Sequence, residues 1–320
     1  MKFDKKNFFL YLNKNFLFEN NPVIAVAVSG GPDSMALIYL MKEWIKSKKG
    51  KIVALLIDHK LRAESYNECK KTKNYLKTLN VNSKIITVSA KKIYKKNMYE
   101  ARQNRYDKLI GFCKNQNILH LFLGHHFDDN LETFLIRKVA GSNFEGLASM
   151  PFSNIRNKVQ LIRPLINYKK NQIIKFNKAN KIKFIDDPSN FNEKYTRVVI
   201  RNFLIQKNHM YIIKKDFKII SSYIPLYKKM INEILHQILI KIKKNNVVVS
   251  LKNFNNLDEV LKEKIIEKIF YYFQTKNKKL RYSKIKIFLN ELNKNNLKPF
   301  NISNIIVVKN QNSLDFSLNK

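Results

Sequence analysis

VIAVAV (23–28) runs directly into SGGPDS (29–34), and MALIYLMKEWI (35–45) follows. The first stretch is a continuous apolar run, which is typical of a strand buried on both faces of a parallel sheet. The glycines and the proline of the second stretch predict a sharp turn, and the third stretch has the composition and length of a helix. This strand–turn–helix unit predicts an α/β fold.

The same alternation recurs three times in the first half of the chain. Further strands are expected at 52–57 (IVALLI), 84–88 (KIITV) and 118–124 (ILHLFLG), with helices at 63–80, 99–117 and 128–139. Four such repeats predict an open, doubly wound, mostly parallel sheet, whose ligands bind beyond the carboxyl ends of the strands.

The remainder of the chain predicts a second domain. Residues 141–165 are rich in Gly, Ser and Asn and are expected to form a connection, and a helix is expected at 168–181. From about 206 to about 274 the sequence favours long Ile/Leu/Lys helices, with a small hairpin at 305–309 and 314–318. We therefore expect domains at 1–215 and 216–320, the second smaller and mainly helical.

The composition limits the classes of protein. Lys and Arg number 61 against 24 Asp and Glu, a net charge of +37, which favours a polyanionic partner. Lys, Asn and Ile are abundant throughout while Gly and Pro number 7 each, so part of this charge reflects a chain-wide compositional bias. The two cysteines, Cys69 and Cys113, exclude a disulfide scaffold, and no apolar run is long enough to span a membrane. These features predict a soluble, cytoplasmic protein with no membrane partner.

The turn at 29–34 carries the strongest chemical signal. Gly30 and Gly31 allow backbone amides to approach an anion, and the hydroxyls of Ser29 and Ser34 lie beside a helix N-terminus. The carboxylate of Asp33 can hold Mg²⁺ against phosphates in the same turn. The motif is neither the Walker pattern nor the dinucleotide G-x-G-x-x-G, and it predicts a site for a nucleotide polyphosphate.

Two further polar segments follow predicted strands. DHKLR (58–62) ends the second strand, where His59 could meet a nucleotide and Arg62 a phosphate, or where the segment is only a solvated turn. HHFDDNLET (125–133) ends the fourth strand, and its Asp129 and Glu132 share one helix face.

The acidic pair at the start of that helix has three interpretations. The helix dipole alone favours carboxylates at a helix N-terminus. Paired histidines are compatible with a metal, but adjacent histidines point in different directions and the cysteines of a zinc site are missing. In so basic a chain, an acidic pair beside an anion-binding turn indicates a receptor for an ammonium group.

Seven segments, in this order, resemble the tRNA(Ile)-lysidine synthetases, which are PP-loop ATP pyrophosphatases with an adenine nucleotide hydrolase-like fold. The segments are SGGPDS (29–34), DHKLR (58–62), ARQNRY (101–106), GHHFDDNLETFLIRKVAGSNFEGLASM (124–150), IRPL (162–165), DDPSN (186–190) and TRVVIR (196–201). The resemblance covers residues 20–205, and the C-terminal third matches only in position and length.

The resemblance implies an ATP- and Mg²⁺-dependent ligase. In this family ATP adenylates the C2 oxygen of the wobble cytidine of an isoleucine tRNA with a CAU anticodon, and the side-chain amine of free L-lysine then displaces AMP. The product, lysidine, changes codon reading from AUG to AUA. The first domain would bind ATP and carry out the chemistry, and the second would bind tRNA; a homodimer is left open.

The resemblance also implies roles for individual residues. Those expected to bind ATP are Ser29, Gly30, Gly31, Pro32, Asp33, Ser34, Asp58 and His59. Those expected at the chemistry are Asp33, which would hold Mg²⁺ through the ATP phosphates, Arg102, and the lysine-binding pair Asp129 and Glu132. Arg197 and Arg201 would lie on the phosphate or tRNA side.

The chain departs from the family pattern at three positions. Lys60 stands where the family usually has Gly, and Met98 or Glu100 aligns with an acidic residue that precedes the Ala-Arg pair. Val198 replaces the Asn of an Arg-Asn-x-x-Arg element. The turn at 29–34 and the acidic pair keep the family residues.

Two other functions compete with this one. A PP-loop tRNA thiolase would be expected to depend on cysteines, of which this chain has only two, far apart. A non-catalytic RNA-binding protein would suit the charge but gives no role to Asp33, Asp129 and Glu132.

Overall fold

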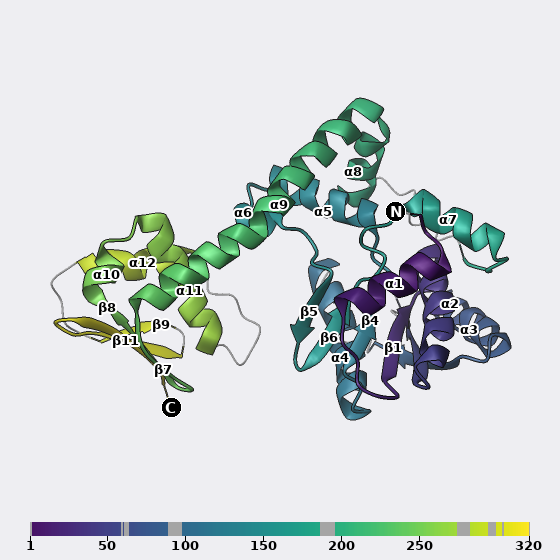
Figure 1. The fold of residues 1–320 in the computed structure, drawn as a ribbon, viewed down its shortest axis with the longest axis horizontal. Helices are drawn as coiled ribbons and strands as arrows, with labels where there is room; N and C mark the ends of the chain where they lie inside the picture. Colours follow the sequence, from purple (N-terminus) through teal and green to yellow (C-terminus); the bar gives the residue numbers. More distant parts are fainter. Residues whose placement is uncertain are drawn as a thin grey trace. The chain divides into compact units, whose positions relative to one another are not determined.

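The computed structural model describes residues 2–58, 60, 64–88, 98–185, 196–273, 282–293, 299–302 and 304–319. The chain divides into two compact units, Met1–Ile220 and Ser221–Lys320 (Figure 1). This division lies inside helix α9 (Lys207–Ile238), beyond the boundary predicted at residue 215.

The first unit is built on a six-stranded sheet with the order β3-β2-β1-β4-β6-β5. Its strands are β1 (Val23–Val28), β2 (Lys51–Asp58), β3 (Asn82–Thr87), β4 (His120–Phe122), β5 (Ser153–Arg156) and β6 (Val159–Ile162). All neighbours pair in parallel except β5, which is antiparallel to β6. The predicted doubly wound, mostly parallel sheet is therefore confirmed.

Helices cover both faces of this sheet (Figure 1). Helices α1 (Lys5–Asn15), α2 (Pro32–Ser47), α3 (Ser65–Thr78) and α7 (Lys170–Ala179) share one apolar cluster with alternate residues of β1 such as Ile24 and Val26. Helix α4 (Met98–Asn115) shares the opposite cluster with Ala25. Burial on both faces explains why VIAVAV is apolar throughout.

The prediction of a simple connection at residues 141–165 was wrong. They form α6 (Phe144–Leu147) and the β5–β6 hairpin, and β6 extends the parallel sheet beyond β4. Asn157 and Lys158, between the two strands, both have positive φ, at 50° and 68°. Positive φ at both central residues is the signature of a type I′ hairpin turn. Such turns usually have Gly at the second position, so Asn-Lys did not predict one.

Three helices form a separate cluster at the carboxyl side of β4. Helices α5 (Phe127–Val139), α8 (Thr196–Ile205) and α9 bury Phe134, Leu204 and Phe217 together. This packing fixes the first two turns of α5, which carry Asp129 and Glu132, relative to α8, which carries Arg197 and Arg201.

The second unit combines helices with an antiparallel sheet of order β7-β8-β11-β10-β9. Its elements are β7 (Leu239–Lys243), β8 (Asn246–Ser250), α10 (Leu251–Asn255), α11 (Glu259–Phe273), α12 (Tyr282–Asn293), β9 (Phe300–Ile302), β10 (Ile305–Lys309) and β11 (Ser313–Leu318). The predicted hairpin is present as β10–β11. The expectation of long helices from about 206 to about 274 was wrong at 239–250, where Val247 and Val249 alternate into the core of the β7–β8 hairpin.

Candidate active site

The turn after β1 is closed by its two serine side chains. Ser34 Oγ accepts a hydrogen bond from the backbone N–H of Ser29 (3.1 Å) and donates one to the carbonyl of Gly31 (3.0 Å). The hydroxyls of Ser29 and Ser34 lie 3.2 Å apart. Helix α2 begins at Pro32, so the unpaired N–H groups of its first turn lie where an anion would bind.

Two glycines let other elements approach this turn closely. Gly30 has φ +87°, and a Cβ there would lie 2.7 Å from Thr72 Oγ1 on α3. A Cβ on Gly124, just after β4, would lie 3.2 Å from the backbone nitrogen of Ser34. The lack of a side chain at Gly124 therefore brings the segment leading into α5 directly against the turn.

His126 joins the turn to the acidic helix. It caps α5: its Nδ1 accepts from the backbone N–H of Asp129 (3.4 Å), and Asp129 Oδ2 accepts from its backbone N–H (3.1 Å). Its Nε2 lies 3.5 Å from Asp129 Oδ2 and 3.8 Å from Asp33 Oδ1. One imidazole thus lies between a carboxylate of the turn and a carboxylate of the acidic pair.

Asp129 stays ionised although it is largely enclosed. Burial alone would raise its pKa, but the neighbouring His126, the backbone N–H of His126 and Arg197 together lower it. A carboxylate held in its charged form is suited to binding an ammonium group.

Glu132 is the more deeply buried member of the acidic pair. Its side chain is 2% exposed, and its Oε1 accepts from Arg201 Nε at 2.8 Å. Among the described residues, its Oε2 has no hydrogen-bond partner. Burial lowers the pKa of Arg201, but the hydrogen bond and charge of Glu132, together with the charges of Asp129 and Asp33, raise it overall. All three carboxylates therefore act on one guanidinium.

A group of arginines borders the acidic pair. Arg102 lies 3.4 Å from Nε2 of His125, and burial with nearby Arg163 and Arg102 lowers the pKa of His125 to about 3. Burial and the charge of Arg102 also lower the pKa of Arg105. His125 is therefore neutral, and the guanidinium groups form a positive region that would favour an anion.

Arg163, from the IRPL segment, is buried and positions the chain after α6. Its Nη1 donates to the carbonyl of Pro151 (3.1 Å) and to Asn154 Oδ1 (2.9 Å). His126, Arg105 and Arg163 were not among the predicted site residues. Their signals were present in HHFDD, ARQNRY and IRPL, but only the fold shows that these segments meet.

The segment after β2 has a structural role that the sequence did not predict. The buried carboxylate of Asp58 accepts from the backbone N–H of Lys60 (3.0 Å) and from the hydroxyl of Ser65 (2.7 Å). Lys60 has φ 50°, a conformation that Gly adopts at lowest cost. His59 and Arg62 lie outside the described residues.

The remaining predicted residues lie on α4 and α8. Arg197 donates to Thr133 Oγ1 (3.3 Å), beside the acidic pair. Val198 is buried, so this departure replaces a polar side chain with an apolar contact. Met98 begins α4, and the DDPSN segment lies outside the described residues.

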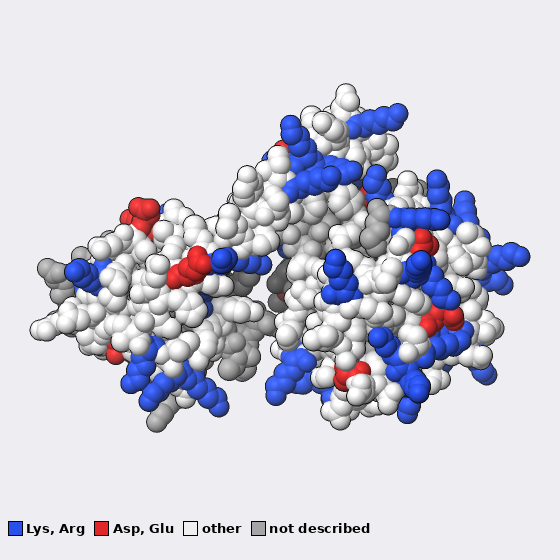
Figure 2. Space-filling view, in the orientation of Figure 1, with Lys and Arg blue, Asp and Glu red and all other residues white. Residues whose placement is uncertain are grey.

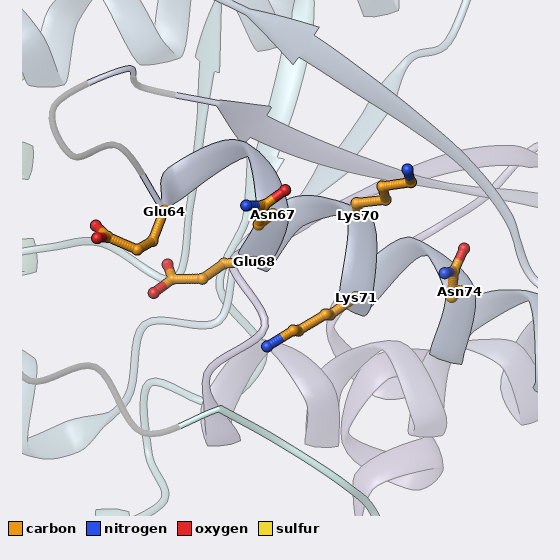
Figure 3. A pocket seen from close by; sticks show the side chains of 6 residues that line it. All are labelled: Glu64, Asn67, Glu68, Lys70, Lys71 and Asn74. Carbon is orange, nitrogen blue, oxygen red and sulfur yellow. The ribbon is translucent and has the colours of Figure 1, made fainter.

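A hollow of about 460 Å³ lies beside α3 (Figure 3). It is lined by Glu64, Asn67, Glu68, Lys70, Lys71 and Asn74. None of these six is a predicted site residue, and they present both signs of charge. This hollow therefore does not indicate a ligand by its chemistry.

Charge and hydropathy agree with the composition. In Figure 2, Lys and Arg side chains are scattered over the visible face of both units, and acidic side chains are few. Within the described ranges, no helix has the length and apolar character needed to cross a membrane. The same residues contain no group of three or more His, Cys, Asp or Glu placed to hold a metal ion.

The parallel sheet and the SGGPDS turn define a PP-loop protein. Residues 5–208 match the family model described as PP-loop domain. The fold is also similar to that of the U34-tRNA thiolase NcsA from Methanococcus maripaludis, with a TM-score of 0.56 at 18% identity over 68% of this chain and 80% of that one.

Proteins of similar sequence show which family within the PP-loop class the chain belongs to. The tRNA(Ile)-lysidine synthase of Wolbachia pipientis wMel is 40% identical over 61% of this chain and 46% of its own length. That of Wolbachia sp. subsp. Brugia malayi (strain TRS) is 32% identical over 88% of this chain and 67% of its own. The chain belongs to the tRNA(Ile)-lysidine synthase family, and it spans about half the length of the first of these relatives.

Proposed function

We propose that this chain uses ATP to join free L-lysine to C2 of the wobble cytidine in an isoleucine tRNA with a CAU anticodon. One observation carries the proposal: His126 lies within 3.8 Å of Asp33 in the phosphate-binding turn and 3.5 Å of Asp129 in the acidic pair. A site for a polyphosphate and a site for an ammonium group are thus adjacent.

The turn is suited to the ATP phosphates. Ser29, Ser34 and the first N–H groups of α2 offer donors, and the lack of a side chain at Gly30 and Gly31 leaves the backbone accessible. Asp33 Oδ1 has no hydrogen-bond partner among the described residues, and a free carboxylate oxygen fits Mg²⁺, which takes one or two carboxylates along with substrate phosphates. Asp33 would hold the ion, which would neutralise phosphate charge.

The reaction proceeds in two displacements. The C2 oxygen of the cytidine attacks the α-phosphorus of ATP and the bond to pyrophosphate breaks, giving an adenylated tRNA. The ε-ammonium of lysine gives one proton to a carboxylate of the acidic pair, and the resulting amine attacks C2. The C2–O bond breaks, AMP leaves, and the new C–N nitrogen releases its extra proton to water. Asp129 and Glu132 would bind the lysine side chain and hold its nitrogen near C2, which is catalysis by positioning.

The arginines would act on the phosphate charge. Arg102 beside neutral His125, with Arg105 and Arg197 close by, forms a fixed positive region. Such preorganised cations stabilise the charge that develops on the adenylate and the leaving pyrophosphate. Cations beyond the site would bind the tRNA backbone, with the salt dependence typical of phosphate contacts.

The chemistry of the cysteines disfavours the thiolase alternative. Burial raises the pKa of Cys69 to about 11 and that of Cys113 to about 12. Both thiols are protonated at neutral pH and are poor nucleophiles. Replacing both by Ser is expected to leave lysine incorporation intact.

Radiolabelled lysine tests the proposal directly. We expect the label to enter a CAU-anticodon isoleucine tRNA transcript only with ATP and Mg²⁺, with one AMP and one pyrophosphate released per lysine. A transcript with uridine at the wobble position is the matched control and should stay unlabelled. Folded protein that binds the tRNA but incorporates no lysine would contradict the proposal.

A further inference from the structure

Lys170, on α7, contacts both the phosphate-binding turn and α5. It is the first residue of α7, its backbone N–H donates to Asp128 Oδ2 at 2.6 Å, and its Nζ donates to Asp33 Oδ2 at 2.5 Å. An ammonium group therefore lies beside a turn that has no lysine of its own.

Helix α7 is fixed to the backbone of that turn. Asn177, which is fully buried, donates from Nδ2 to the carbonyl of Pro32 at 2.8 Å. Ile173, one turn earlier, is buried in the core cluster that contains α2. Because α7 is bonded to the turn itself, the stem of Lys170 starts from a defined position relative to it.

The turn needs a cation from elsewhere. In the G-x-x-x-x-G-K-[ST] loop, a lysine within the loop reaches the β- and γ-phosphates. The sequence SGGPDS offers only hydroxyls, amides and an acidic side chain. The Lys170 side chain is 37% exposed, so a ligand in the turn can reach its Nζ.

We propose that Lys170 binds the polyphosphate of ATP and that, when no nucleotide is bound, it pairs with Asp33 instead. This inference rests on the proposed use of ATP. Binding would move Nζ from Asp33 Oδ2 to phosphate oxygens and leave both oxygens of Asp33 available to Mg²⁺. Lys170 is then the remote counterpart of the P-loop lysine.

Calorimetric titration of Lys170→Met with Mg-ATP and with AMP tests this role. ATP binding is expected to weaken at least about tenfold, and AMP binding to change by less than about twofold, because the lost contact is to the outer phosphates. Lys169→Met, at the exposed neighbouring position, should match the wild type, and Lys170→Arg should keep ATP affinity within about threefold. Unchanged ATP affinity in Lys170→Met would overturn the inference.

Two results separate this inference from the proposed function. Wild-type protein that binds no ATP would contradict the proposed function itself, whatever Lys170 does. If Lys170→Met does not fold, acetylation of wild-type amines read by mass spectrometry serves instead. ATP should slow labelling of Lys170 and not of Lys169, and AMP should protect neither; equal labelling of Lys170 with and without ATP would overturn the inference.

Discussion

Arg201 and Glu132 form an ion pair in which the carboxylate is buried and the guanidinium is half-exposed. Nε of Arg201 lies 2.8 Å from Oε1 of Glu132, with the side chains 41% and 2% exposed. The pair joins α8 to α5, and it supplies a cation at the position where we propose that the lysine substrate binds. A positive side chain therefore balances the buried charge.

Removing Arg201 should destabilise the fold. Arg201→Met leaves the buried Glu132 without its cation, and the free energy of unfolding is expected to fall by about 1–3 kcal/mol, less than for a fully buried pair since water reaches this side. Adding Glu132→Gln should recover much of that loss. Urea unfolding of the wild type, Arg201→Met, Glu132→Gln and the double variant measures the coupling energy between the two side chains.

An exposed pair provides the control for that cycle. Lys229 and Glu233 lie 3.6 Å apart on α9 with side chains 74% and 59% exposed, so Lys229→Met should change stability by less than about 0.5 kcal/mol. An Arg201→Met protein as stable as the wild type would show that Glu132 does not depend on this partner.

Asp129→Asn should weaken the use of lysine without changing nucleotide binding. It keeps an oxygen that can accept from His126 but removes the negative charge, so the KM for lysine should rise about tenfold or more. Affinity for ATP and tRNA should change little. Asp258→Asn, exposed in the turn before α11, is the matched control and should leave the lysine KM unchanged. A loss of tRNA binding in Asp129→Asn would assign Asp129 to a different role.

His125 should make stability depend on pH. Burial lowers its pKa to about 3, whereas an unfolded histidine titrates near about 6.5. Between these values the unfolded chain binds more protons, so stability should fall by about 1 kcal/mol per pH unit as the pH drops through this range. His125→Gln should flatten this slope in urea unfolding at several pH values. His236→Gln, at an exposed position, is the control and should leave the slope unchanged. An unchanged slope in His125→Gln would contradict the burial of a neutral imidazole.

Gly124 should accept no side chain. Its Cβ would meet the backbone of the turn at 3.2 Å from Ser34 N and 3.3 Å from the Asp33 carbonyl carbon, so Gly124→Ala must shift the turn. We expect a loss of about 1–3 kcal/mol in stability together with weaker ATP binding. Gly111→Ala, in α4 with open space around it, should instead stabilise by about 0.5–1 kcal/mol. Equal effects of the two substitutions would show that the turn tolerates the contact.

The sequence predicted the parallel sheet because its signals are local. VIAVAV and IVALLI are continuous apolar runs, and each is followed by turn residues and a helical stretch. The β5–β6 hairpin was missed because its turn uses Asn157 and Lys158, and β7–β8 because five-residue strands beside long helices carry a weak pattern. In both cases pairing with distant strands decided the structure.

The acidic pair and the glycine turn could be recognised from the sequence alone, because spacing along one helix or one turn fixes which side chains share a face. Which charged groups meet across the chain could not. The ion pairs Lys170–Asp33 and Arg201–Glu132 join residues separated by 137 and 69 positions. Such pairs form only when packed helices bring distant residues together, since no local preference encodes a contact between them.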